Sequence, residues 1–263
     1  MTEPTIEIER QGAIASVWLN RPEVHNALNE TMIDEITEAF RALARDSSIR
    51  VIVLSGRGKS FSAGADIESM KRQGAAPITA NLENARQLAE MFRTIAESPK
   101  PTVARINGAA IGGGLGLVAA CDIAIASSTA IFAASEVRLG LIPSTIAPYV
   151  VRAIGERHAR RLFQTAERIS ALQAQAIGLV HEVAPPDQLD TALKSILDNL
   201  LAGAPNAQHA AKNLIDAVAH QPITLDLIEN TAVRIATIRS EPEAREGLSA
   251  FLEKRPANWV PHE

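Results

Sequence analysis

The sequence predicts an α/β fold with short strands and a helical C-terminal region. Patterns typical of strands and of helices alternate along the chain to about residue 140, and this alternation favours an α/β architecture. From Ser144 onward nearly all of the patterns are helical. Of the 263 residues, 46% are apolar but only 3% are aromatic, so the core must be built mainly from Ala, Ile, Leu and Val.

The chain opens with a pattern typical of a β-hairpin. Thr5–Arg10 and Ala13–Asn20 each alternate apolar and polar residues, and a Gln-Gly pair separates them, which favours two strands joined by a tight turn. The amphipathic run Glu30–Ala44 comes next. Asn29 precedes it and is a favourable N-cap residue. We therefore expect a hairpin followed by a helix that begins after Asn29.

The next elements alternate between buried-type strands and helices. Arg50–Ser55, Pro101–Ile106 and Cys121–Ala126 are short apolar runs of the kind found in buried strands. A long helical pattern covers about Ala80–Glu97, and a glycine-rich turn with a small-residue helix covers Gly112–Ala120. A strand–strand–helix spacing recurs loosely, which is only weak evidence for a repeated unit.

The C-terminal part of the chain is predicted to be almost entirely helical. His181–Ala184 is one further candidate strand, and from Pro205 onward the patterns are helical only and carry more charge. We therefore divide the chain into a core over residues 1–200 and a helical C-terminal region over residues 201–263.

Composition and charge exclude several classes of protein. With 26 Lys and Arg against 30 Asp and Glu, the net charge is −4, which argues against a nucleic-acid binder held by a basic field. The single cysteine permits no intrachain disulfide and favours a reducing compartment. Met1–Glu7 lacks the features of a signal peptide, and the glycine-interrupted stretch Ile106–Ala126 is a poor membrane span. We expect a cytoplasmic protein with no membrane segment.

Common cofactor and metal motifs fail on spacing. Gly58-Lys-Ser60 resembles the end of a phosphate loop, but Val53 stands where that motif needs glycine. The glycine run from Gly112 places Leu117 at the last position of the dinucleotide-binding pattern. The six histidines are scattered without metal-ligand spacing. We therefore expect neither a metal nor a separate cofactor.

Three segments are candidates for chemistry. Phe61–Asp66 and Gly112–Gly114 are rich in small residues, which let backbone N–H groups approach a ligand, and two such donors could form an oxyanion hole. Within Ala133–Pro143, Glu136 and Arg138 interrupt an apolar stretch. Desolvation would raise the pKa of Glu136 and suit acid–base work. The alternatives stay open: ordinary tight turns, and an internal Glu136–Arg138 ion pair.

Together these segments resemble the enoyl-CoA hydratase/isomerase family, the crotonase superfamily. The likeness covers nearly the whole chain and keeps the family's motif order through Asn20–Asn29, Phe61–Asp66, Asn107–Gly114, Cys121-Asp122 and Phe251–Arg255. The resemblance implies a spiral of β-β-α turns with a helical C-terminal trimerisation region, assembled as a homotrimer or a dimer of trimers. It also implies an acyl-CoA thioester substrate, with CoA entering as part of that substrate.

The resemblance also assigns site residues. The thioester carbonyl would lie between the backbone N–H groups of Ala65 and Gly113, and Glu136 matches a catalytic glutamate. The contacts to CoA would come from Val24, Ala63, Asp66 and Ile67, and from Phe251 and Lys254 of a neighbouring subunit. By charge alone, Arg57 and Lys59 are either phosphate contacts or part of a solvated loop.

One position departs from the family pattern. Typical hydratases carry a second glutamate where this chain has Gly116, so a single carboxylate remains. The stretch Ser135–Pro143 resembles the methylglutaconyl-CoA hydratase subgroup, and Arg138 would then bind the distal carboxylate of the substrate. Glu136 would handle the proton, with water held by Glu136 or by that substrate carboxylate. This interpretation predicts a hydro-lyase that acts on a branched or acidic enoyl-CoA.

Two alternatives to the hydro-lyase remain. A Δ3,Δ2-enoyl-CoA isomerase needs only one glutamate to move a proton between two carbons. A non-catalytic or RNA-binding member of the family could use the basic cluster formed by Arg152, Arg157, His158, Arg160 and Arg161. The net charge of −4 favours a solvated helix face for that cluster.

Overall fold

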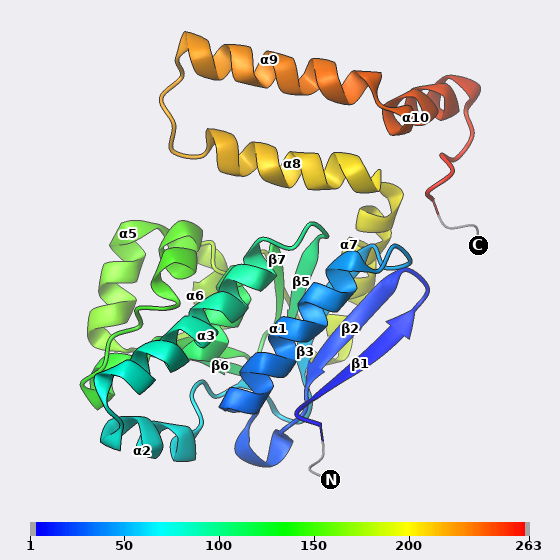
Figure 1. Ribbon diagram of the computed structural model, residues 1–263. Coiled ribbons are helices and arrows are strands. Elements are labelled where there is room, and N and C mark those ends of the chain that lie inside the picture. The colour runs from blue at the N-terminus through cyan, green and yellow to red at the C-terminus, as the bar shows by residue number, and fades with distance from the viewer. Residues whose placement is uncertain (1–3, 261–263) are drawn as a thin grey trace.

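The structure, a computed structural model, describes residues 4–260. The first three residues of the segment considered above for a signal peptide lie outside this range. The chain forms two sheets with helices around them (Figure 1). The larger sheet is ordered β1 (Ile6–Gln11), β2 (Ile14–Leu19), β3 (Val51–Gly56), β5 (Thr102–Ile106), β7 (Ile123–Ser127) and β10 (Glu182–Ala184). The smaller sheet is ordered β4 (Ser60–Ser62), β6 (Ala109–Ile111), β8 (Ile131–Ala133) and β9 (Ile169–Ser170).

The helices alternate with the strands in the first part of the chain and then run consecutively. The α-helices are α1 (Glu30–Arg45), α2 (Ile67–Ala75), α3 (Ile78–Ala96), α4 (Gly113–Ala120), α5 (Ala147–Thr165), α6 (Ala171–Ala176), α7 (Leu189–Ala202), α8 (Pro205–Val218), α9 (Leu225–Ser240) and α10 (Pro242–Glu253). The 3-10 helices are η1 (Pro22–Val24), η2 (Glu136–Leu139) and η3 (Pro186–Gln188).

The core follows a repeated β-β-α path. Each turn places one strand in the larger sheet and the next in the smaller sheet, and a helical segment follows: β3–β4–α2, β5–β6–α4 and β7–β8–η2. The strands of the larger sheet pair in parallel from β2 to β10, while β1 and β2 form the predicted antiparallel hairpin. The predicted α/β spiral and the helical C-terminal region are confirmed.

The central strands β3, β5 and β7 of the larger sheet are buried on both faces, which explains their continuous apolar sequences. One face packs against α1, α3 and α4 in the main core, where Phe40, Met91 and Phe92 are fully buried. The other face packs against α7 through Leu189 and Leu197. Because successive side chains of a strand point to opposite faces of the sheet, one strand contributes to both cores.

The predicted helix start at Asn29 is also confirmed. The Asn29 side chain accepts a hydrogen bond from the Met32 N–H at 2.9 Å, which satisfies a donor that the first helical turn leaves unpaired. Along α1 the buried positions include Ile33, Ile36 and Phe40, which recur at helical spacing. This stripe holds α1 on the sheet.

Helices α8, α9 and α10 extend away from the two sheets (Figure 1). Helix α7 ends at Ala202, close to the predicted division of the chain at residue 200. The helical character predicted from Pro205 onward is confirmed, while the division into two domains stays a prediction. Among residues 4–260, no helix combines the length and the apolarity that crossing a bilayer requires.

Candidate active site

Glu136 lies against the turn that opens α4. It begins η2 shortly after β8, and β8 pairs in parallel with β6, the strand that leads into α4. A Cβ atom placed on Gly112 would lie 3.1 Å from Glu136 Oε1. Gly112 also has a φ of +51°, which disfavours residues with side chains. Glycine at position 112 therefore allows the carboxylate to approach the start of α4.

The environment of Glu136 favours proton transfer. Its Oε2 atom is buried and has no hydrogen-bond partner among the described residues. Burial raises the pKa of this carboxyl above the ordinary glutamate value, because desolvation disfavours the charged form. The ion pairs within residues 4–260 do not include Glu136 with Arg138, so the ion-pair alternative is wrong. A carboxyl whose pKa is raised in this way is better suited to accept and return a proton.

The Ala65 N–H is left free by the pairing of its neighbours. Leu28 and Ala65 form an isolated parallel bridge. The Leu28 N–H donates to Gly64 O at 2.7 Å, and the Asp66 N–H donates to Leu28 O at 3.0 Å. In a parallel bridge these two bonds flank the central residue, so the Ala65 N–H points away from Leu28. Ala65 is exposed, and its N–H has no partner among the described residues.

Gly113 supplies a second free N–H group. It is the first residue of α4, and no side chain caps this helix. The N–H groups of a first helical turn have no intrahelical acceptor and carry the positive end of the helix dipole. Gly113 is half-buried, so this donor lies at an edge that a ligand can reach.

The two donor segments are in direct contact. A Cβ atom on Gly64 would lie 3.4 Å from Gly113 N and 2.7 Å from Ile111 O, and Gly64 has a φ of +89°. Only glycine at position 64 allows this approach without strain. The structure therefore brings Ala65, Gly113 and Glu136 together around the start of α4, and their catalytic roles stay a prediction.

The position of the missing second glutamate has no free volume. A Cβ atom on Gly116 would lie 2.3 Å from Ile146 Cγ2 and 2.9 Å from Phe92 Cε1. Both side chains are fully or almost fully buried, so neither can move aside cheaply. The site therefore holds one carboxylate, and apolar side chains from α3 and the start of α5 occupy the space of the other.

The predicted CoA contacts fall on two loops that are joined by hydrogen bonds. Val24, Ala63 and Ile67 are exposed, and the Ala63 N–H donates to His25 O at 2.9 Å. Asp66 is buried instead. Its carboxylate caps α2 by accepting from Glu68 N and Ser69 N. The CoA contacts stay a prediction, and the Asp66 side chain has a structural role in the same loop.

The Asp66 carboxylate also pairs with Arg21 at 2.9 Å. Burial acts to raise the pKa of Asp66, but the hydrogen bonds from Ser69 and Arg21 outweigh it and hold the pKa below the ordinary value. The ionised form is thus the one that the fold stabilises. This ion pair connects the loop of residues 21–28 to the start of α2.

The other predicted contact residues lie on three different parts of the chain: α10, η2 and the loop after β3. Figure 1 shows α10, which carries Phe251 and ends at Lys254, at the opposite end of the molecule from α2. Arg138 is exposed in η2, two residues after Glu136. Arg57 donates to Glu7 at 2.7 Å and to Glu9, and its guanidinium lies 4.1 Å from the Trp18 ring centre. Arg57 therefore belongs to a surface network on the hairpin.

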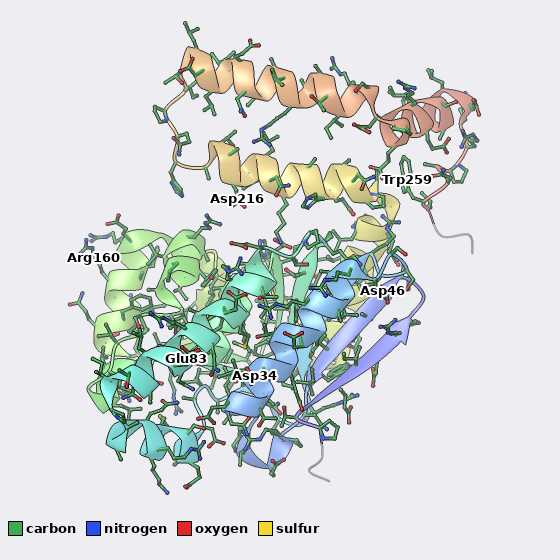
Figure 2. The ribbon with its side chains drawn as sticks, viewed as in Figure 1. Asp34, Asp46, Glu83, Arg160, Asp216 and Trp259 are labelled. Carbon is green, nitrogen blue, oxygen red and sulfur yellow. The ribbon has the colours of Figure 1, made fainter. Side chains whose placement is uncertain are left out.

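The basic cluster on α5 is largely neutralised. Arg152 pairs with Asp216 at 3.1 Å, Arg160 with Glu156 at 3.4 Å, and Arg161 with Glu167 at 2.5 Å. Figure 2 shows Arg160 pointing outward from α5 into solvent. These pairs favour the solvated helix face over an RNA-binding surface. The described residues also contain no cluster of three or more His, Cys, Asp or Glu side chains that could hold a metal ion.

The sequence did not reveal the residues that orient the Ala65 N–H group and fill the space beside Gly116. Leu28 fixes the direction of the Ala65 N–H, and Ile146 with Phe92 fills the space beside Gly116. The Asn-Ala-Leu-Asn stretch that contains Leu28 is part of the quoted motif, so a signal for that residue was present. Ile146 lies 30 residues after Gly116 in the sequence, and no local pattern connects the two positions.

Known proteins resemble this chain over nearly its whole length. The family model described as "Enoyl-CoA hydratase/isomerase" matches residues 9–261. A crotonyl-CoA hydratase of Syntrophomonas wolfei is 33% identical over 99% of both chains. A short-chain-enoyl-CoA hydratase of Clostridium acetobutylicum is 34% identical over 94% of both chains.

The solved structures give the same result at the level of the fold. The crystal structure of an enoyl-CoA hydratase from Shewanella pealeana superposes with a TM-score of 0.94 at 39% identity, covering 97% of this chain and 96% of that one. The likeness extends over the spiral core and the C-terminal helices alike. The chain belongs to the enoyl-CoA hydratase/isomerase family.

Proposed function

We propose that the chain is an enoyl-CoA hydratase-like lyase that adds water across the double bond of an enoyl-CoA thioester and uses Glu136 as its one carboxylate. The observation that carries this proposal is the juxtaposition of the half-buried Glu136 carboxylate, whose Oε2 atom is buried without a partner, with two unpaired N–H donors around the start of α4. The names of the relatives support the same reaction class.

The proposed mechanism uses these groups in sequence. The thioester oxygen accepts hydrogen bonds from the Ala65 and Gly113 N–H groups, and the Glu136 carboxylate removes a proton from water. The resulting hydroxide oxygen bonds to C3, and the electrons of the C2=C3 double bond move onto the thioester oxygen as an enolate. The protonated Glu136 then returns its proton to C2, the enolate collapses, and a 3-hydroxyacyl-CoA results. Loss of one oxyanion donor typically costs roughly 10²–10³ in rate.

The finer substrate proposal is an acidic, branched enoyl-CoA such as 3-methylglutaconyl-CoA. Arg138 is exposed, belongs to the same short helix as Glu136 and has no ion-pair partner among residues 4–260. A guanidinium can bind a carboxylate through two parallel hydrogen bonds. Arg138 would therefore hold the distal carboxylate of the acyl chain.

One observation favours a second function, a Δ3,Δ2-enoyl-CoA isomerase. The space beside Gly116 is filled by Ile146 and Phe92, so a second carboxylate for activating water is absent. In an isomerase, Glu136 alone would remove a proton from C2 and return it to C4. The same oxyanion donors would stabilise the dienolate.

A product assay separates the two functions. The purified protein is incubated with 3-methylglutaconyl-CoA, crotonyl-CoA and a 3-enoyl-CoA, beside the Glu136→Gln variant. Formation of 3-hydroxyacyl products that is lost in the variant supports the hydratase. Double-bond migration without hydration supports the isomerase.

We also propose that the chain assembles as a homotrimer or a dimer of trimers through residues 201–263. Helices α8 and α9 bury none of their residues in the single chain. Large apolar side chains of this region are exposed: Ile215, Ile223, Leu225, Ile228, Val233, Ile235, Leu248, Phe251 and Leu252. Exposed apolar surface on this scale marks an association surface. Phe251 and Lys254 would then reach the CoA of a neighbouring subunit.

A further inference from the structure

The loop before α1 contains two successive strained residues. His25 and Asn26 both have a φ of +55°, the left-handed region that residues other than glycine rarely adopt. Such a conformation persists only where surrounding contacts enforce it, and it is frequent at functional sites. The contacts that enforce it here are made by Asn26, which is fully buried.

The Asn26 amide is hydrogen-bonded through both of its ends. Its Oδ1 atom accepts from the Arg21 N–H at 2.9 Å. Its Nδ2 atom donates to Arg57 O and to Ser60 O, each at 2.9 Å. A Cβ atom on Gly56 would lie 2.8 Å from this nitrogen, so glycine at position 56 leaves room for the amide. The Asn26 side chain thereby fastens the loop of residues 21–28 to the loop that enters β4.

The backbone of the same loop fastens the segment that carries the Ala65 donor. Asn26 O accepts from the Ser62 hydroxyl at 2.8 Å, and this hydroxyl accepts from the Gly64 N–H at 3.3 Å. His25 O accepts from the Ala63 N–H at 2.9 Å. The bonds from Ser62 and Ala63 join the left-handed pair to residues within three positions of Ala65, and the bond from Gly64 extends the connection along that segment.

Leu28 completes the connection. Its N–H and its carbonyl bond to Gly64 O and to the Asp66 N–H, on either side of Ala65. The direction of the Ala65 N–H is therefore set by where residues 25–28 lie. Their position in turn depends on the Asn26 amide.

We propose that Asn26 is a positioning residue that aims the Ala65 N–H at the thioester oxygen. This inference rests on the proposed oxyanion hole, since Asn26 itself touches neither substrate nor Glu136. Removal of the amide would release the loop of residues 21–28 from Arg57 O and Ser60 O, which hold it against the loop that enters β4. The Ala65 N–H would then no longer point at the thioester oxygen, while the surfaces proposed to bind CoA would remain unchanged.

The test compares Asn26→Gly with Ser55→Ala. Glycine adopts the left-handed backbone without strain, so this variant removes the amide hydrogen bonds without forcing the backbone into another region. Ser55 is a matched control because it is equally buried and its hydroxyl donates to Arg105 O of the neighbouring strand β5 at 2.8 Å, and to neither loop. For each protein, kcat and KM are measured with crotonyl-CoA.

A spectroscopic measurement reports the oxyanion hole directly. The probe is an aryl enoyl-CoA with an electron-donating dimethylamino group, whose absorbance shifts to the red when its thioester carbonyl is polarised. We expect a red shift in the wild type and in Ser55→Ala, and a much smaller shift per bound probe in Asn26→Gly. We expect kcat of Asn26→Gly to fall roughly 10- to 100-fold, since small misplacements carry costs of this order, with KM and probe affinity nearly unchanged.

The outcomes separate this inference from the proposed function. A full red shift in Asn26→Gly, with kcat within about twofold of Ser55→Ala, overturns the role of Asn26 and leaves the oxyanion hole intact. The absence of a shift in the wild type overturns the oxyanion hole, and the role of Asn26 with it. If Asn26→Gly does not fold, Ser62→Ala removes only one connection and must show a smaller loss in the same two readouts. An unchanged red shift in Ser62→Ala then overturns the proposal.

Discussion

At the scale of single residues, the ionisation of Glu136 is the feature with the clearest consequences. Its Oε2 atom is buried without a partner among the described residues, and burial raises the pKa of this carboxyl above the ordinary glutamate value. The proposed reaction requires the ionised form. We therefore predict that kcat/KM rises with pH through a pKa that lies above the ordinary range of glutamate, as measured by initial rates with crotonyl-CoA between about pH 4 and 9. An acid limb at the ordinary value of about 4.3 would contradict the burial argument.

The same pKa shift also affects the stability of the fold. Activity is expected to rise with pH as Glu136 ionises, whereas stability is expected to fall. A carboxyl whose pKa is raised in the folded state binds its proton more tightly there than in the unfolded chain. Its ionisation therefore destabilises the fold as pH rises from the ordinary pKa through the raised one. Glu136→Gln should lower kcat roughly 10²–10⁴-fold and raise Tm at about pH 7. The gain in Tm should vanish below about pH 4, where both proteins carry a neutral side chain.

Arg138 gives a second prediction at this scale. If its exposed guanidinium binds a distal substrate carboxylate, Arg138→Leu should raise KM for 3-methylglutaconyl-CoA roughly 10-fold or more, the cost of a charge-assisted hydrogen bond. KM for crotonyl-CoA, which has no such carboxylate, should change little. Steady-state kinetics with both substrates measure the difference, and equal effects on the two would refute the assignment.

At the scale of elements, the contact between β4 and α4 holds the two oxyanion segments together. A Cβ atom on Gly114 would lie 2.5 Å from Ser62 O. This oxygen belongs to the backbone, so it cannot move aside as the end of a flexible side chain could. We predict that Gly114→Ala destabilises the protein by about 1–3 kcal/mol, the usual cost of overpacking, and lowers kcat. Urea denaturation and rate measurements check both effects.

Gly74 is the matched control for that variant. It lies in α2 without a positive φ, and a methyl group added there would meet no atom within 4 Å. Gly74→Ala should therefore stabilise the protein by about 0.4–1 kcal/mol through the unfolded chain. If both alanine variants behaved alike, the close contact of Gly114 with β4 would not be what matters.

The long elements could be predicted from the sequence, but most of the short ones could not. The hairpin and α1 carry several alternations or turns of pattern, and the buried strands are continuous apolar runs. Among the short strands, the sequence predicts only β10, as His181–Ala184. The strands β4, β6, β8 and β9 have two or three residues each, too few for a period of two to be recognised. They form the second sheet only because consecutive β-β-α turns stack them.

In the candidate site, residues within sequence motifs could be predicted, whereas contacts between distant parts of the chain could not. Glu136, Ala65 and Gly113 could be selected because each lies in a motif. The filling of the space beside Gly116 could not, since Ile146 and Phe92 reach it from two other helical segments. The left-handed backbone at His25 and Asn26 could not be predicted either, because it depends on contacts with residues 57–64.

At the scale of the whole molecule, polar contacts fasten the C-terminal helices to the core. Lys212 of α8 pairs with Asp122 at 2.8 Å, and Arg50 donates to Leu201 O and to Trp259 O at 2.8 and 2.7 Å. Figure 2 shows Asp216 on the side of α8 that faces the core and Trp259 beside the junction of α7 and α8. The exposed apolar side chains of this region are left without partners in the single chain, which favours association with further copies.

The proposed assembly makes a prediction about shared sites. Glu136→Gln lacks the catalytic carboxylate, while the double variant Phe251→Ala with Lys254→Ala lacks the contacts offered to a neighbour's CoA. If sites are shared, a working site needs a core with Glu136 and a neighbouring subunit with an intact C-terminus. With equal co-expression, each requirement is met in half of the cases. We therefore expect roughly one quarter of the wild-type activity. Light scattering should give the mass of a trimer or hexamer. Activity no higher than the sum of the two parents, or a monomeric mass, would contradict the assembly.

The whole molecule is proposed to hydrate an enoyl-CoA with one buried carboxylate beside two free N–H groups. The decisive experiment is incubation with crotonyl-CoA, 3-methylglutaconyl-CoA and a 3-enoyl-CoA in ¹⁸O-labelled water, followed by mass analysis of the products. We expect one labelled oxygen in a 3-hydroxyacyl-CoA, formed by the wild type and lost in Glu136→Gln. Migration of the double bond in a 3-enoyl-CoA, with no label incorporated in any product, would refute the hydratase and leave the isomerase in its place.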